Sequence, residues 1–305
     1  MSLITLFSAP KPFVDPHIDI IQHNAVRSWK ALGNDVDVLL LGAEEGLAKA
    51  AAELGVRHIS EVRCNTHGTP LINSLFETAR QASKSPLLGF VNTDIMLMPD
   101  VVESARQLYE QSRAFLMVGQ RWDLEVTEML GFSPGWVERL EADLAKRGRL
   151  HPPGGSDYFI FPQNCFYDIP DLAVGRAGWD NWMIYEARQR GWDCVDCTDS
   201  VRIIHQDHDY RHLPGGQPHY RLPETNDNVR LGGGPRTIFT LQDSNRRLVD
   251  GQLVAAERTG RIFWREIEIF PLVQLHSFLL ANLFFAFFHP RRAYHELRNW
   301  LRRIS

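Results

Sequence analysis

The chain has 305 residues, a mass of 35.0 kDa and a formal net charge of -4, enough for one large α/β domain with a tail or for two small domains. Its 44% hydrophobic and 23% charged residues are ordinary for a globular protein, and the slight negative charge excludes a general attraction to nucleic acid. The four cysteines are too few for a disulfide framework, which favours a reducing cytoplasm.

Strands and helices alternate through the first third of the chain. Its first residues lack the basic start and long apolar core of a signal peptide and indicate a strand. Period and composition predict strands over 3–7, 36–41, 56–59 and 87–91, and helices over 19–32, 46–54 and 69–83. This alternation predicts a mainly parallel sheet flanked by helices, a Rossmann-type α/β fold with its loops gathered at the carboxyl edge.

The remaining elements follow the same alternation up to a long irregular stretch. Helices are predicted over 101–112, 136–147 and 181–190, and strands over 114–119, 158–162, 194–198 and 201–204. Residues 212–236 are rich in Pro, Gly and Asn and predict a long loop over the site, after which 237–254 is expected to return to the sheet. We therefore expect a catalytic domain over 1–265 and a helical tail over 266–305.

Polar clusters follow several of the apolar segments. In an alternating sheet, the first and the last cluster would converge on one edge. A carboxylate with imidazoles, leaving positions open for phosphate oxygens, suits Mn²⁺ or Mg²⁺ holding a diphosphate. A separate carboxylate at a helix start could accept a proton from an attacking hydroxyl. The clusters are Asn92 with Asp94, residues 154–157, Asp180, and His205 with His208.

This order of clusters resembles the GT-A class of nucleotide-sugar glycosyltransferases over roughly residues 3–212. The resemblance implies a GT-A fold, transfer of a sugar from a nucleotide diphosphate donor to a hydroxyl, and Mn²⁺ or Mg²⁺ as cofactor. Asn92 and Asp94 take the place of the Asp-x-Asp motif that binds donor and metal, with Asn92 where the class has its first Asp. Asp180 takes the place of the base, which implies inversion, although Gly178 and Trp179 precede it.

The resemblance also implies roles for residues around these motifs. His205 takes the place of the metal-binding histidine; His208 is a further metal ligand, or else binds phosphate or closes the loop. Ser8 and Glu44 stand at strand ends where the fold holds the base and ribose of the donor. The expected acceptor site consists of Gly154 and Gly155 in the glycine loop, Asp157, Tyr158 and Arg121. A glycan or a lipid-linked glycan is the expected acceptor.

Several alternatives remain open from the sequence. Asp180 could simply cap its helix, and Arg121 could form a surface ion pair. Cys194 and Cys197 have a zinc-like spacing, but no second pair follows, which favours an ordinary strand. A metal-dependent phosphohydrolase using His205, His208 and Asp209 is the second functional hypothesis, followed by a nucleotidyltransferase and a non-catalytic nucleotide-binding module. Oligomeric state is left open, with a homo-oligomer among the alternatives.

The end of the chain combines an apolar and a basic segment. Residues 269–288 are strongly apolar but interrupted by polar groups that would be costly inside a bilayer. Arg291, Arg292, Arg298, Arg302 and Arg303 follow. This composition is typical of an interfacial anchor, so we expect weak peripheral contact with the inner face of the membrane through 267–305. Packing of this tail on the catalytic domain, or a dimer contact, is the alternative.

Overall fold

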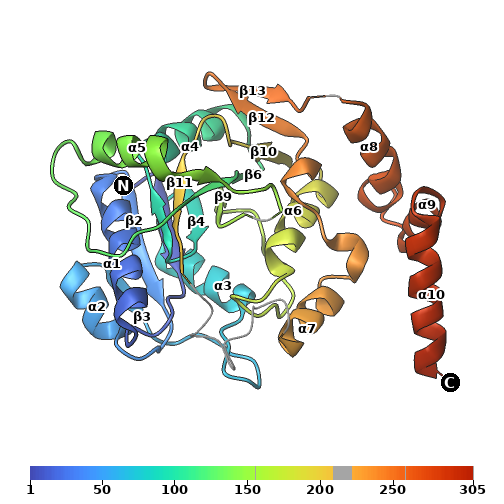
Figure 1. Cartoon of the computed structure of the whole chain (residues 1–305), viewed down its shortest axis with the longest axis horizontal. Coiled ribbons are helices and arrows are strands. Elements are labelled where there is room, and N and C mark those ends of the chain that lie inside the picture. The colour runs from blue at the N-terminus through green and yellow to red at the C-terminus, as the bar shows by residue number, and fades with distance from the viewer. Residues whose placement is uncertain (155, 209–221, 258, 305) are drawn as a thin grey trace.

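The computed structural model describes residues 1–154, 156–208, 222–257 and 259–304, and its centre is a large twisted sheet (Figure 1). Within these residues the sheet has nine strands in the order β13-β12-β10-β6-β9-β4-β1-β2-β3. They are β1 (Ile4–Ser8), β2 (Val36–Leu41), β3 (Arg57–Ile59), β4 (Leu87–Val91), β6 (Phe115–Val118), β9 (Tyr158–Pro162), β10 (Asp193–Asp196), β12 (Arg246–Val249) and β13 (Gln252–Ala255).

Most neighbours in this sheet are parallel. The exceptions are β9, which runs antiparallel between β4 and β6, and β13, which runs antiparallel to β12 at the edge. β4 is buried along its whole length, because β1 and β9 pair with its two edges and its side chains join the cores on both faces of the sheet. The expected α/β fold with a mainly parallel sheet is therefore confirmed, and 237–254 does return to it, through β12.

A second, four-stranded sheet has the order β5-β11-β7-β8. Its strands are β5 (Ile95–Leu97), β7 (Arg121–Leu124), β8 (Arg149–Leu150) and β11 (Ile203–Gln206). β11 is antiparallel to β5 and parallel to β7. The strand expected near 201–204 therefore belongs to this small sheet rather than to the main one.

Helices cover both faces of the main sheet (Figure 1). One core contains side chains of α1, α2 and α4, and the other contains side chains of α3, α6 and α8. The helices are α1 (Pro16–Ala31), α2 (Leu47–Leu54), α3 (Ile72–Ala82), α4 (Asp100–Gln111), α5 (Trp136–Arg147), α6 (Trp179–Gln189), α7 (Pro223–Leu231), α8 (Gly260–Val273), α9 (Phe278–Phe288) and α10 (Pro290–Ile304).

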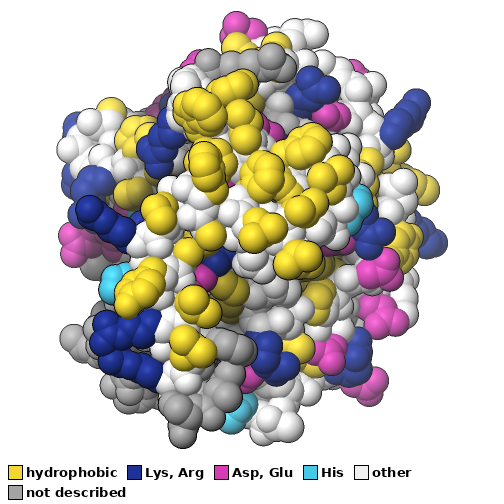
Figure 2. Space-filling model, turned by 90° about the vertical axis from the view of Figure 1, so that its right-hand side faces the viewer, with side chains coloured by type: hydrophobic (Ala, Val, Ile, Leu, Met, Phe, Trp, Pro, Cys, Tyr) yellow, Lys and Arg dark blue, Asp and Glu magenta, His cyan; other side chains and the backbone are white. Residues whose placement is uncertain are grey.

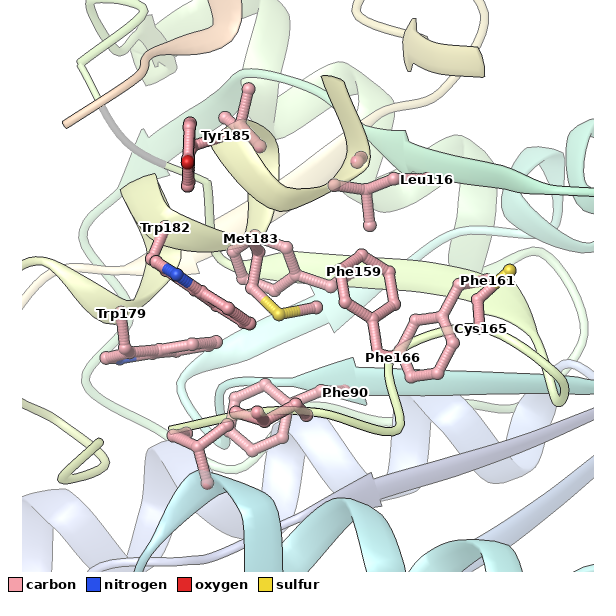
Figure 3. Close-up of a cluster of buried hydrophobic side chains, with 14 of the residues drawn as sticks. Phe90, Leu116, Phe159, Phe161, Cys165, Phe166, Trp179, Trp182, Met183 and Tyr185 are labelled. Atoms are coloured by element: carbon pink, nitrogen blue, oxygen red, sulfur yellow. The ribbon is translucent and has the colours of Figure 1, made fainter. Parts of the chain in front are cut away.

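An aromatic cluster ties the start of α6 to the centre of the sheet (Figure 3). The ring of Trp179 lies 5.0 Å from that of Phe90 on β4 and 5.0 Å from that of Phe159 on β9. Burial of such large side chains stabilises by roughly 1.5–3 kcal/mol each. The residue after Trp179 is therefore held at a defined place above the sheet.

The C-terminal part differs from the expected division of the chain. Residues 223–231 form α7 instead of a loop, and 209–221 lie outside the described residues. The expected boundary at 265/266 falls inside α8, whose Ile269, Leu272 and Val273 belong to a core shared with the sheet. Among the described residues, no helix is long and apolar enough to cross a membrane.

Close packing at Gly89, in the middle of β4, gives a test of this arrangement. A Cβ there would lie 2.7 Å from Leu6 Cδ2 and 3.1 Å from Ile160 Cγ1. Gly89→Val should lower the free energy of unfolding by about 1–3 kcal/mol, the usual cost of overpacking a core, measured by urea denaturation. Gly131→Val is the control, because a Cβ at Gly131 meets nothing within 4 Å. Equal stability of the two variants would contradict the packing.

Candidate active site

A cleft of about 400 Å³ opens where the two sheets meet. It is bounded by the segments that follow β1, β2 and β4, by β7 and β11, and by the start of α6. Eight of the residues predicted for the site line it: Glu44, Asn92, Asp94, Arg121, Asp157, Asp180, His205 and His208. The structure thus brings together groups that are more than a hundred residues apart.

The turn that follows β4 joins the two sheets. The chain leaves the main sheet at Val91, turns, and enters the small sheet at Ile95, whose N–H donates to the carbonyl of Asn92 at 3.0 Å. The N–H of Asn92 donates to the carbonyl of Asp157 beside β9, and the N–H of Gln206 on β11 donates to that of Asp94, both at 3.0 Å. Backbone contacts therefore fix both ends of the turn.

Strand register then places imidazoles beside Asp94. His205 pairs with Ile95 across the β5–β11 ladder. Asp94 directly precedes Ile95, so His205 lies next to Asp94. Nε2 of His208 lies 3.1 Å from Oδ2 of Asp94. One ligand atom from each of Asp94, His205 and His208 lies within 4.8 Å of the others. The predicted convergence of the first and last clusters is confirmed.

This group fits a divalent cation. Oδ1 of Asp94 is buried and has no hydrogen-bond partner among the described residues. A buried carboxylate oxygen without a partner is expected where a cation binds. One carboxylate with two imidazoles leaves positions open for phosphate oxygens, which suits Mn²⁺ or Mg²⁺. Asp123, His205 and Asp207 form a second group with close ligand atoms, but neither carboxylate lines the cleft.

Charges around the group favour its ionised forms. Burial acts to raise the pKa of Asp94, but Lys11 and the two imidazoles outweigh it and hold that pKa well below the usual value. Burial acts to lower the pKa of His205, but Asp123 and Asp207 outweigh it and raise that pKa to about 9. A metal ion would therefore have to displace a proton from His205 before it could bind there.

Asn92 is held by a neighbouring polar chain. Its Nδ2 donates to Oδ1 of Asp157 at 2.9 Å, and Nη1 of Arg121 donates to Oδ2 of the same carboxylate at 2.8 Å. Nε of Arg121 also donates to Asp123 at 3.0 Å. Both oxygens of Asp157 are thus engaged, which suits it to orienting Asn92 and Arg121 at the cleft wall.

Asp180 stands at the first turn of α6. Gly178 precedes the helix with φ of 103°, a conformation that favours glycine, and its N–H donates to Oδ1 of Asp180 at 3.2 Å. Burial, with a further contribution from Asp157, raises the pKa of the Asp180 carboxyl to about 6. A carboxylate with this pKa at a cleft is suited to accept a proton near neutral pH.

Sequence reasoning missed the residues contributed by three loops. Lys11 lies in the loop after β1, with Nζ 3.1 Å from Oδ2 of Asp94. Thr69 and Arg176 line the opposite wall, where Nε of Arg176 donates to Glu224 of α7 at 2.7 Å. The prolines around Lys11 carried no chemical signal in the sequence, and the Arg176–Glu224 pair joins residues 48 positions apart.

Some predicted site residues do not line the cleft. Tyr158 is fully buried in the core with its hydroxyl against Gly119, because successive side chains of a strand point to opposite faces and Asp157 faces the cleft. Ser8 is buried beneath the loop, and Gly154 contributes a carbonyl to Asn181. The structure thus places these three residues outside the lining of the cleft, and their contact with substrate stays a prediction. Gly155 and Asp209 lie outside the described residues.

The structure also bears on the cysteine pair. Cys194 and Cys197 are buried and free, and Sγ of Cys194 lies 3.6 Å from the hydroxyl of Ser244. Neither cysteine belongs to a candidate metal group in the described part of the chain. The strand interpretation holds for Cys194 on β10.

No protein-family model matches the chain, and no curated protein is similar to it in sequence. Several solved structures with a similar fold are glycosyltransferases. A structure of Staphylococcus aureus TarS with UDP-GlcNAc superposes with a TM-score of 0.51 at 10% identity, covering 76% of this chain and 65% of that one. That chain comprises residues 1–349 of TarS, so the likeness spans about two thirds of this segment.

Two further structures show weaker likeness. Glucosyl-3-phosphoglycerate synthase from Mycobacterium tuberculosis with Mn²⁺, UDP and phosphoglyceric acid has a TM-score of 0.45 at 13% identity, covering 77% of this chain and 79% of that one. A Pyrobaculum calidifontis mannosyltransferase with GDP-Man and Mn²⁺ has a TM-score of 0.43 at 8% identity, covering 69% and 58%. The chain has the GT-A fold of nucleotide-sugar glycosyltransferases.

Proposed function

We propose that this protein is a glycosyltransferase that moves a sugar from a nucleotide diphosphate sugar to a hydroxyl acceptor. The observation that carries the proposal is that one cleft, in a GT-A fold, holds both Asp94 with its two imidazoles and Asp180 with its raised pKa. Nothing favours the phosphohydrolase: its third residue, Asp209, lies outside the described residues, and the similar folds belong to transferases.

The donor would lie along the wall formed by the loops after β1, β2 and β4. Asn92 and Asp94 would face its diphosphate, and Glu44 would face the nucleoside; all three line the cleft. Mn²⁺ or Mg²⁺ bound by Asp94, His205 and His208 would supply positive charge to the departing nucleoside diphosphate. The structure of TarS contains a donor of this class, UDP-GlcNAc.

The acceptor would approach from the side of α6. Asp180 would take the proton of its hydroxyl, which lets the oxygen attack the anomeric carbon with inversion. Asp157 and Arg121 line the same cleft and would orient the donor sugar or the acceptor. A glycan or lipid-linked glycan, as in polysaccharide biosynthesis, is the acceptor class that we propose, with the chain working in the cytoplasm.

Asp180→Asn tests the base. The amide keeps the size of the side chain but cannot take a proton, so transfer should fall by roughly 10²–10⁴-fold while donor affinity stays unchanged. Release of nucleoside diphosphate from a panel of nucleotide sugars and hydroxyl acceptors measures transfer. Asp168→Asn, on the surface, is the matched control. Near-native transfer by Asp180→Asn would contradict the role of a base and leave Asp180 only the role of a helix cap.

The pKa of Asp180 predicts a pH dependence. The carboxyl accepts a proton only when ionised, so the rate of transfer should fall as pH drops through about 6. The residual rate of Asp180→Asn should lack this step, because the variant has no titrating group there. Initial rates of transfer, measured with saturating donor from about pH 5 to about pH 8, check this pH dependence. A step that persists in the variant would assign the titration to another group.

The C-terminal helices form an exposed apolar face that we propose as a membrane contact. Figure 2 shows hydrophobic side chains gathered across this face, with basic side chains around them. On α9, Leu279 is 73% exposed and Phe287 is 79% exposed. The inner side of the same helices is occupied: Ala281 joins the core, and Arg236 lies over the ring of Phe285 at 3.3 Å.

The charge of the neighbouring helix supports an anionic lipid surface as the occupant of this face. Arg291, Arg292, Arg298 and Arg302 of α10 are exposed. Each basic group near an anionic bilayer adds about 1 kcal/mol of binding. An apolar face rimmed by arginines is the pattern of interfacial helices, and it would keep the cleft near a lipid-linked acceptor.

Phe287→Glu tests the membrane contact. Loss of one buried phenyl group removes roughly 1.5–3 kcal/mol, so co-flotation with phosphatidylserine vesicles should fall at least tenfold. Val14→Glu, at an exposed apolar residue far from α9, should float like the wild type. Absence of wild-type flotation, or equal flotation of both variants, would contradict the proposal and leave the face as an interface between proteins.

A further inference from the structure

Lys11 occupies a position inside the candidate metal group. Its Nζ lies 3.1 Å from Oδ2 of Asp94 and 3.0 Å from Nε2 of His208. These are two of the three groups that would ligate a divalent cation. The ammonium therefore supplies the positive charge that the buried carboxylate needs while no metal ion is bound.

The backbone of Lys11 is fixed, so this placement is built into the fold. Pro10 and Pro12 flank the residue and restrict the chain. Gln22 of α1, which is only 1% exposed, accepts the N–H of Lys11 at 2.7 Å and donates to its carbonyl at 3.0 Å. The hydroxyl of Thr93 donates to the same Gln22 oxygen at 2.9 Å. One buried amide thus holds the Lys11 loop against the turn that carries Asp94.

An ammonium and a divalent cation compete for this group of ligands. Mn²⁺ and Mg²⁺ approach carboxylate oxygens to about 2.0–2.2 Å, where two like charges near one oxygen repel each other strongly. The lysine side chain is long and flexible, so its ammonium can move aside while the backbone stays in place. Oδ1 of Asp94 is open to the ion, but an ion that also ligates Nε2 of His208 would take the place of Nζ at that nitrogen. Binding of the ion through these two atoms would therefore displace Nζ.

We propose that Lys11 is an internal counter-cation that competes with the divalent ion for Asp94 and His208, and so lowers the affinity of the site for metal. The proposal rests on the metal site described above and not on sugar transfer. In the metal-free state Lys11 holds the two ligands together, and in the loaded state it is released towards the cleft.

Lys11→Met tests the competition, because methionine keeps an unbranched side chain and removes the charge. The dissociation constant for Mn²⁺ alone, measured by titration calorimetry or by the EPR signal of free Mn²⁺, should fall at least tenfold in this variant. Lys49→Met, at an exposed lysine of α2, is the matched control and should bind Mn²⁺ like the wild type. Adding Asp94→Ala to Lys11→Met should abolish the gain, and thermal unfolding shows whether each variant folds.

The outcomes separate this inference from the proposed function. Tighter Mn²⁺ binding by Lys11→Met supports it even if the wild type transfers no sugar, since no donor is present in the titration. Unchanged or weaker binding, or a gain that survives removal of the Asp94 carboxylate, would overturn it. Absence of Mn²⁺ binding in all folded variants would overturn it as well.

Discussion

The site depends on the antiparallel pairing of β5 with β11. Asn92–Asp94 is the point at which the chain passes from the main sheet to the small one, and the pairing of Ile95 with His205 fixes the imidazole beside the carboxylate. Main-chain bonds to Asp157 and Gln206 hold the turn from both sides. A shift of one residue in this register would turn His205 to the opposite face of the strand, so the chemistry of the cleft relies on backbone pairing made far from it in sequence.

Much of the fold was predictable because its signals are local. The apolar run of β4 and the helical period of α5 have the same bounds in the structure as in the sequence analysis, Leu87–Val91 and Trp136–Arg147. Sheet membership was not predictable, since β11 pairs with strands 80 and more residues away and nothing local marks the second sheet. α7 was missed because its Pro- and Asn-rich composition resembles that of a loop.

Site residues that lie at the ends of strands could be predicted from the sequence. Site residues that lie in loops could not. Asp94 and His205 follow the strand-end rule, and the structure brings them together. Tyr158 was misplaced because the alternation of side chains across β9 cannot be read without knowing which face is the core. Lys11 was overlooked because its position depends on Gln22, one of several buried polar residues of α1. Long-range polar contacts of this kind leave no periodic signal.

The most direct test of the account is a crystal structure with a nucleoside diphosphate, UDP or GDP, and Mn²⁺. The account predicts that the ion binds between Asp94 and the imidazoles of His205 and His208, with the diphosphate against it and Asp180 across the same cleft. Nζ of Lys11 should then have left Oδ2 of Asp94. A nucleotide bound elsewhere, or an ion that avoids Asp94, would contradict the central claim that this turn is the donor site.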